Sequence, residues 1–182
     1  VTGVQTCALP ICNPGLVLDR FANLTNEPNS RISSFKNAQA NLSNLEDLYS
    51  IKFKHWEESL KSAKTTICKT DFNRVLIGGN ESVFETSIRL HSIFGFPIIP
   101  GSALKGVTAN YVASIYDKEP GFSQGGEYYN NIFGDTDSQG LVVFHDAWIL
   151  PEYLSNSLLL DTIGKIFSKV VLKVITLIQL LS

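Results

Sequence analysis

An α+β fold is predicted by three segments taken together. Residues 74–79 (Arg-Val-Leu-Ile-Gly-Gly) are typical of a short apolar strand that ends in a glycine pair, and a helical pattern begins after Pro100. Residues 140–150 form a nearly continuous apolar run, which predicts a buried strand. Strand, helix and strand in this order, within about 80 residues, are the first half of a ferredoxin-like (RRM-like) βαββαβ unit.

Length and composition predict one globular domain with a real core. The chain has 182 residues, of which 44% are hydrophobic and 18% are charged. Its formal net charge is −2, whereas proteins that bind nucleic acids unaided usually carry a basic excess. The charge therefore argues against RNA binding by this chain alone, but leaves room for a local basic site inside a larger assembly.

The cysteines predict neither disulfides nor metal. Cys7, Cys12 and Cys68 are sparse, odd in number and without the spacing of a zinc site, and no histidine cluster accompanies them. We expect reduced thiols in a cytoplasmic protein, with no metal and no cofactor.

Both ends of the sequence look non-native. Methionine is absent, and residues 1–12 resemble a translated sequencing adapter, so we expect this leader to pack on nothing. Residues 163–182 contain no acid and consist mainly of Ile, Leu, Val and Lys. An out-of-frame tail, a basic amphipathic helix and a membrane span all fit this composition. Each of the three lysines 165, 169 and 173 would cost roughly 2.5–3.5 kcal/mol near the centre of a span.

An N-terminal helical extension, residues 13–66, precedes the predicted core. Residues 25–34 are polar and read as a loop. A helix is expected from about residue 41, because apolar side chains recur there at spacings of three and four: Leu45, Leu48, Tyr49, Phe53, Trp56 and Leu60.

The predicted core, residues 67–162, contains a turn and a second helix. Gly95-Phe-Pro97 is typical of a turn within a hairpin or irregular extension. The helix that begins near Pro100 is expected to bury a face made of Leu104, Val107, Tyr111, Val112 and Ile115.

Residues 95–106 carry the strongest candidate site. Ser102 is placed to be the N-cap of the second helix, which puts Lys105 at the third helical position. A cation is unfavourable at the positive end of a helix, so Lys105 suggests that an anion binds there, with Gly101 and Gly106 allowing its close approach. The alternative is a solvated surface lysine. A nucleotide-binding P-loop is excluded, because no Gly-Lys-Ser/Thr follows at the required spacing.

Other candidate residues are weaker. His91 and His145 are lone histidines, which favours packing or hydrogen bonding over metal ligation. Asp146 lies at the end of an apolar run, where we expect it to accept hydrogen bonds from nearby groups. Phe144 and Trp148 fit core packing better than stacking on RNA bases. No second acid or base is spaced to form a catalytic site.

Several blocks of the sequence resemble the RAMP superfamily of CRISPR proteins. The stretch Gly-Phe-Pro-Ile-Ile-Pro-Gly-Ser-Ala-Leu-Lys-Gly at 95–106 carries the superfamily hallmark. Residues 79–86, residues 140–146 and the opening at 13–21 are similar to the Cmr-type subunit-six family of type III-B effector complexes. The resemblance covers about residues 13–162. It stops there, which favours the out-of-frame origin of residues 163–182.

The resemblance implies a truncated RAMP core of ferredoxin-like fold. It implies a non-catalytic structural subunit that contacts CRISPR guide RNA and other RAMP subunits, with no membrane contact. Ser102 and Lys105 would meet the RNA backbone beside Gly101, with Arg89 and His91 as weaker contacts. Two alternatives stay open: another RAMP subunit or RNA-processing endoribonuclease with His91 as its base, and a membrane-associated protein anchored by the tail.

Overall fold

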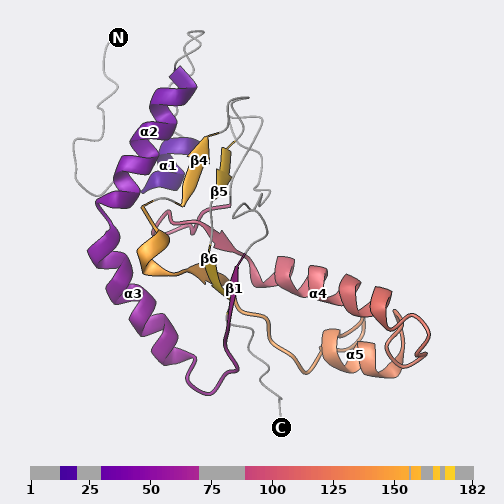
Figure 1. Ribbon diagram of the computed structural model, residues 1–182. Coiled ribbons are helices and arrows are strands. Elements are labelled where there is room, and N and C mark those ends of the chain that lie inside the picture. The colour runs from indigo at the N-terminus through magenta and orange to yellow at the C-terminus, as the bar shows by residue number, and fades with distance from the viewer. Residues whose placement is uncertain are drawn as a thin grey trace. The chain divides into compact units, whose positions relative to one another are not determined.

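The structure is a computed structural model that describes residues 13–19, 30–69, 89–155, 157–160, 166–168 and 171–174. These residues belong to two compact units. The first unit includes residues up to 55, 69–98 and 149–172, and the second includes 56–68, 99–148 and the residues from 173 onward. The elements, labelled in Figure 1, are α1 (Pro14–Asp19), α2 (Ser30–Ser43), α3 (Glu46–Ser59), β1 (Thr66–Lys69), β2 (Ile98–Ile99), α4 (Gly101–Ile115), α5 (Glu127–Phe133), β3 (Ala147–Ile149), the 3₁₀ turn Pro151–Tyr153, β4 (Leu158–Leu160), β5 (Ile166–Ser168) and β6 (Val171–Val174).

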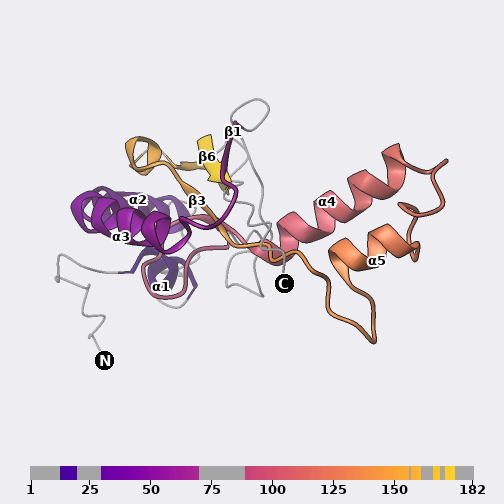
Figure 2. The same ribbon diagram turned by 90° about the horizontal axis from the view of Figure 1, so that it is seen from below.

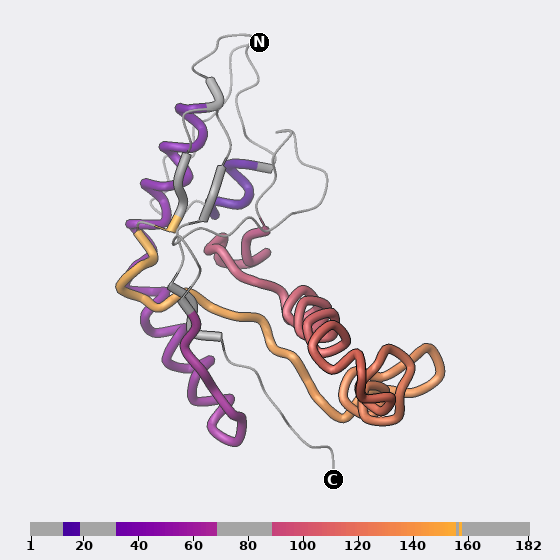
Figure 3. Tube along the Cα trace, turned by 45° about the vertical axis from the view of Figure 1, so that its right-hand side comes forward, coloured from indigo at the N-terminus to yellow at the C-terminus, as the bar shows by residue number. Residues whose placement is uncertain are grey.

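Two consecutive helices supply much of the first unit's core. α2 passes into α3 through Asn44 and Leu45 (Figure 3). The predicted stripe of α3 is confirmed at most positions, because Leu45, Tyr49, Phe53 and Leu60 are buried, whereas Leu48 is exposed. The loop predicted at 25–34 is wrong for residues 30–34, which open α2. The polar composition there is overridden by packing, since Phe35, Ala38 and Leu42 recur on one face and are buried.

Asn13 connects the start of α1, through hydrogen bonds, to the turn that was expected around Gly95. Its Oδ1 accepts hydrogen bonds from the Gly15 N–H (2.8 Å) and the Leu16 N–H (3.4 Å), so it caps the helix. Its Nδ2 donates to the carbonyl oxygens of Ser92 (3.0 Å) and Ile93 (2.8 Å). Gly95 closes this turn with φ of 73°, a conformation that favours glycine. The turn prediction is therefore confirmed. The sequence signal for the cap, an Asn directly before Pro14, was missed.

A buried tyrosine connects α3 to the end of β3. The Tyr49 hydroxyl donates a hydrogen bond of 2.6 Å to the Ile149 carbonyl oxygen, and its ring lies edge-on to Phe96 with centroids 4.6 Å apart. Burial raises the pKa of the Tyr49 hydroxyl well above its usual range. Tyr49 is therefore held neutral in the folded chain.

α4 and α5 lie side by side in the second unit (Figure 2). The helix expected after Pro100 is confirmed as α4, but its predicted buried face is wrong, because Val107, Tyr111 and Ile115 are exposed. Apolar residues occupy several sides of α4, so the helical period alone does not select the side that packs. The protected side instead contains the small residues Gly101 and Ala109, which are buried.

The strands are shorter and differently placed than the sequence predicts. Four strands form one sheet in the order β1-β6-β3-β2. The strand predicted at 140–150 is reduced to β3, and the strand predicted at 74–79, its expected neighbour, lies outside the described residues. The structure is therefore α+β, as expected.

The tail contains strands where a helix was one expectation. β5 pairs antiparallel with β4, with Leu158 opposite Ser168, and β6 belongs to the four-stranded sheet. The amphipathic helix is therefore wrong for residues 166–168 and 171–174, where β-branched residues fit strands well. Within the described ranges, no helix combines the length and apolar character that a membrane crossing needs. The leader at 1–12 lies outside the described residues.

We expect Tyr49→Phe to lower the free energy of unfolding by roughly 1–3 kcal/mol at neutral pH, because the buried Ile149 carbonyl loses its donor. In the parent chain, unfolded tyrosine ionises near pH 10.0 while folded Tyr49 stays protonated. Stability that is present below that pH is therefore lost as the pH rises above it. Tyr49→Phe should flatten this alkaline loss in denaturant titrations at several pH values. Tyr153→Phe, at an exposed hydroxyl, is the control; an equal alkaline loss in the Tyr49 variant would contradict the account.

Candidate functional site

The hallmark stretch at 95–106 ends in the first turn of α4. Pro100 precedes the helix in an extended conformation (φ −58°, ψ 140°), and its carbonyl oxygen accepts hydrogen bonds from the N–H groups of Ala103 (2.9 Å) and Leu104 (3.1 Å). α4 thus begins at Gly101, two residues earlier than expected. The predicted N-cap role of Ser102 is wrong, because this residue already lies inside the helix and its side chain is exposed.

A carboxylate distant in sequence caps α4 instead. The Gly101 N–H donates a hydrogen bond of 2.8 Å to Oδ1 of Asp146, a residue 45 positions away that directly precedes β3. The carboxylate meets the positive end of the helix dipole, where a negative charge stabilises the helix. The expectation that Asp146 accepts a nearby hydrogen bond is confirmed. The negative charge that we attributed to a bound phosphate is therefore supplied, at Gly101, by the chain itself.

The two glycines of the site have different surroundings. Gly101 is buried, and a Cβ added to it would collide with the Phe144 carbonyl oxygen and lie 3.0 Å from the carbonyl carbon of His145. The close approach that glycine permits at position 101 is thus made by the backbone of residues 144 and 145 of the same chain. Gly106 is exposed, and an added Cβ would meet nothing within 4 Å. Gly106 therefore leaves an open surface one turn into α4.

Three of the five predicted site residues lie together. Gly101, Ser102 and Lys105 share the first turns of α4, and the side chains of Ser102 and Lys105 are exposed. Lys105 makes no ion pair with the described part of the chain. Arg89 and His91 belong to the other unit, where Arg89 is exposed and His91 is half-buried. The structure thus offers one cation and one hydroxyl at the start of α4.

His91 stabilises the turn at residues 91–95, to which Asn13 also donates hydrogen bonds. Its Nδ1 accepts hydrogen bonds from the backbone N–H groups of Ile93 (3.2 Å) and Phe94 (3.3 Å). Its ring lies 5.0 Å from Phe94 and 4.8 Å from Phe96, measured between ring centroids. A nitrogen that already accepts two backbone hydrogen bonds is poorly placed to abstract a proton from a substrate.

The aromatic residues of the 144–148 segment pack within their own unit. Trp148 stacks on Trp56 of α3 with ring centroids 4.7 Å apart and planes 7° apart. Phe144 stacks on Phe133 of α5 at 5.9 Å. The prediction of core packing is confirmed for Trp148, which is buried, whereas Phe144 packs on α5 but is half-buried.

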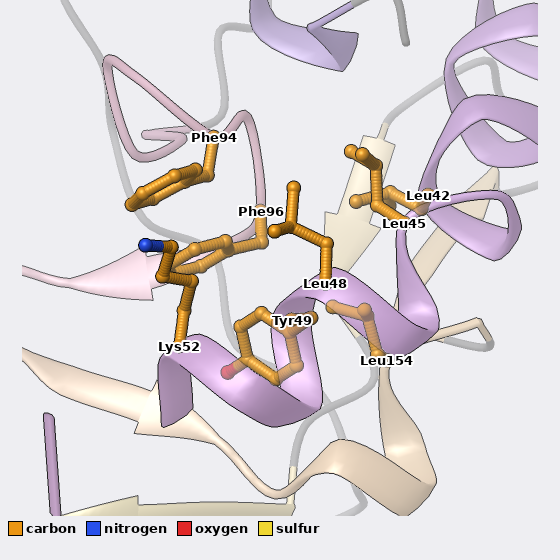
Figure 4. Close-up of a pocket in the computed structure, with 8 residues that line it drawn as sticks. All are labelled: Leu42, Leu45, Leu48, Tyr49, Lys52, Phe94, Phe96 and Leu154. Atoms are coloured by element: carbon orange, nitrogen blue, oxygen red, sulfur yellow. The ribbon is translucent and has the colours of Figure 1, made fainter. Parts of the chain in front are cut away.

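The first unit contains a small apolar pocket between α3 and the turn at Phe94. Figure 4 shows the residues that line it: Leu42, Leu45, Leu48, Tyr49, Lys52, Phe94, Phe96 and Leu154. The enclosed space is about 10 Å³, which is room for about one water molecule. Lys52 lies over the Phe94 ring, with Nζ 6.0 Å from its centroid. The pocket is too small to be a ligand site.

Metal-ligating groups do not gather in the described ranges. There, no group of three or more His, Cys, Asp or Glu side chains lies together, and Cys68 is a free, exposed thiol. Cys7 and Cys12 lie outside those ranges.

Comparisons with known proteins support the resemblance that residues 95–106 carry. A sequence model of the RAMP superfamily matches residues 72–173, which is more than half of the chain. The chain is also similar to the CRISPR system Cmr subunit Cmr6 of Pyrococcus furiosus, with 40% identity over 86 residues. This similarity covers 46% of the chain and 24% of the relative. The superfamily match extends beyond residue 162, where the resemblance was expected to end.

The two glycines predict opposite effects of the same substitution. Gly101→Ala should lower the free energy of unfolding by roughly 1–3 kcal/mol, because the new methyl group must displace the Phe144 carbonyl. Gly106→Ala should raise it by roughly 0.5–1 kcal/mol, because alanine loses less backbone entropy in an open helical position. Denaturant titrations of both variants measure the two changes. An unchanged or increased stability of the Gly101→Ala chain would show that Gly101 has room for a side chain.

Proposed function

The chain belongs to the RAMP superfamily, and on this basis we propose that it is a non-catalytic RNA-binding subunit of a type III CRISPR effector complex. The observation that carries the proposal is the hallmark stretch at 95–106, which opens α4 and leaves Ser102 and Lys105 exposed. The similar protein from Pyrococcus furiosus is a Cmr subunit of a CRISPR system, which supports assembly with other subunits. RNA, the other RAMP subunits and a cytoplasmic location are parts of the same proposal.

The phosphate contact is assigned to Lys105, with the Ser102 hydroxyl beside it. The helix dipole no longer supports this assignment, because Asp146 already occupies the N–H of Gly101. What supports it is an exposed ammonium group without an ion pair in the described part of the chain, beside the open surface at Gly106. A lysine in this setting is a point charge that fits a phosphate group without reading base sequence.

The alternatives receive less support. An endoribonuclease using His91 as its base would need a nitrogen that faces a substrate, whereas Nδ1 accepts hydrogen bonds from Ile93 and Phe94. A membrane anchor in the tail is opposed by β5 and β6, which place residues 166–168 and 171–174 in strands. The finer fold assignment, a ferredoxin-like core that includes α4 and β3, belongs to the proposal as well.

Lys105→Ala should weaken RNA binding about equally for RNAs of different sequence, because a phosphate contact carries no base information. The slope of log affinity against log salt should fall in magnitude by about one unit. Fluorescence anisotropy with two unrelated RNAs across a salt series measures both quantities. Lys118→Ala removes an exposed lysine from the loop after α4 and is the matched control.

Unchanged affinity and slope in a Lys105→Ala chain that melts like the parent would show that Lys105 is only a solvated lysine. A loss confined to one RNA sequence would indicate base recognition and would contradict the phosphate assignment.

A further inference from the structure

The carboxylate of Asp146 puts a negative charge beside the residues to which the RNA contact is assigned. Its Oδ1 accepts the hydrogen bond of 2.8 Å from the Gly101 N–H, and the side chain is half-buried. Asp146 pairs with no cation of the described part of the chain. The start of an α-helix supplies a partial positive charge of about half an elementary charge, which neutralises a full carboxylate charge only in part. A residual negative charge therefore remains at the start of α4.

Lys105 lies one helical turn after Gly101, close enough to this charge for a bound phosphate to feel it. Residues four apart are neighbours on a helix, with a rise of about 6 Å between them. With the lysine side chain extended, a phosphate group at its ammonium lies on the order of 10 Å from the Asp146 carboxylate. The Debye length at physiological ionic strength is about 8 Å, and partly buried charges are screened less than exposed ones. The repulsion between carboxylate and phosphate is therefore reduced by salt but not abolished.

The backbone N–H groups in the first turn of α4 offer an anion little in return. Those of Ala103 and Leu104 donate to the Pro100 carbonyl oxygen. Among residues 101–104, this leaves the N–H of Ser102 as the one that makes no hydrogen bond within the described part of the chain. A helix start that binds phosphate presents several free N–H groups to one anion. RNA is therefore held here by side chains, without compensation from the backbone for the charge of Asp146.

We propose that Asp146 sets the strength of RNA binding at the start of α4, because its charge repels the phosphate group that Lys105 holds. Asp146 thus has two effects that can be separated: its hydrogen bond caps the helix, and its charge weakens the phosphate contact. The inference rests on the proposed phosphate contact at Lys105 and adds to it a residue that limits the affinity of that contact for RNA.

A purely structural role for Asp146 leads to a different expectation. Asparagine keeps an oxygen at the same place but carries no charge, and it caps helices about as well as aspartate does. If only the hydrogen bond mattered, Asp146→Asn would leave both the melting temperature and the RNA affinity unchanged. If the charge acts on RNA, the affinity rises while the melting temperature stays close to that of the parent.

The test measures RNA affinity by fluorescence anisotropy, with the full chain and one single-stranded RNA across a salt series. Asp146→Asn should strengthen binding about two- to fivefold at low salt. The gain should fade as salt rises, because the repulsion is screened. In a Lys105→Ala chain the same substitution should give less than half of this gain, since the two residues act on one phosphate.

The matched control is Asp117→Asn, which removes an exposed carboxylate from the loop after α4. The helix separates this position from Gly101 by about 21 Å, more than two Debye lengths, so RNA affinity should not change. Ala103→Asp provides the reverse test. It adds a carboxylate at an exposed position of the first turn, where an acid suits the helix dipole, and leaves the Asp146 cap in place. It should weaken RNA binding about two- to fivefold.

The results distinguish this inference from the function on which it rests. If the parent chain binds no RNA, the proposed function fails and the inference fails with it. If Lys105→Ala weakens binding while Asp146→Asn and Ala103→Asp leave it unchanged, the function stands and the repulsion is refuted. Weaker binding by an Asp146→Asn chain that melts like the parent would also refute it. An equal gain from Asp117→Asn would show a general effect of net charge and would contradict the assignment to Asp146.

Discussion

The hydrogen bond from the Gly101 N–H to the Asp146 carboxylate is the constraint on which the candidate site depends. It joins the first residue of α4 to the residue before β3, and it brings the Phe144 carbonyl so close that position 101 has no room for a side chain. With the helix start turned inward at Gly101, Ser102 and Lys105 face outward. One carboxylate therefore fixes the helix and at the same time presents the two polar side chains that RNA would meet.

Side-chain hydrogen bonds to the backbone also stabilise the first unit. α3 reaches the end of β3 through the Tyr49 hydroxyl, and the turn at 91–95 is held from inside by His91 and from outside by Asn13. Tyr49 satisfies a buried backbone carbonyl, and leaving such a group unpaired costs more than a formed bond contributes, whereas the bonds of Asn13 and His91 lie nearer the surface and hold the turn in shape. Tyr49, His91 and Asn13 therefore serve to hold the fold of this unit. The two hydrogen bonds that His91 accepts argue against its use as a catalytic base.

The sequence predicted those features of the fold that depend only on residues close together in the chain. The stripe of α3 and the turn at Gly95 could be predicted because spacing and glycine conformation are local properties, and the predicted start of α4 differs from the observed one by two residues. The packed side of α4 was not visible, because apolar residues occupy several of its sides and tertiary contacts choose among them. The caps from Asn13 and Asp146 to distant residues could not be paired from the sequence, since no local pattern links positions 79 or 45 apart. In the candidate site, composition and motif located the exposed lysine, but only the structure showed that its helix end already had an anion.

The central claim is that RNA lies against the exposed start of α4. Ultraviolet crosslinking of the full chain to a guide-like RNA, followed by mass spectrometry of the attached peptides, tests this claim most directly. The account predicts attachment within residues 101–106 and none on the stacked Phe144 or Trp148. Crosslinks concentrated on the 144–148 segment, with none near Lys105, would contradict it.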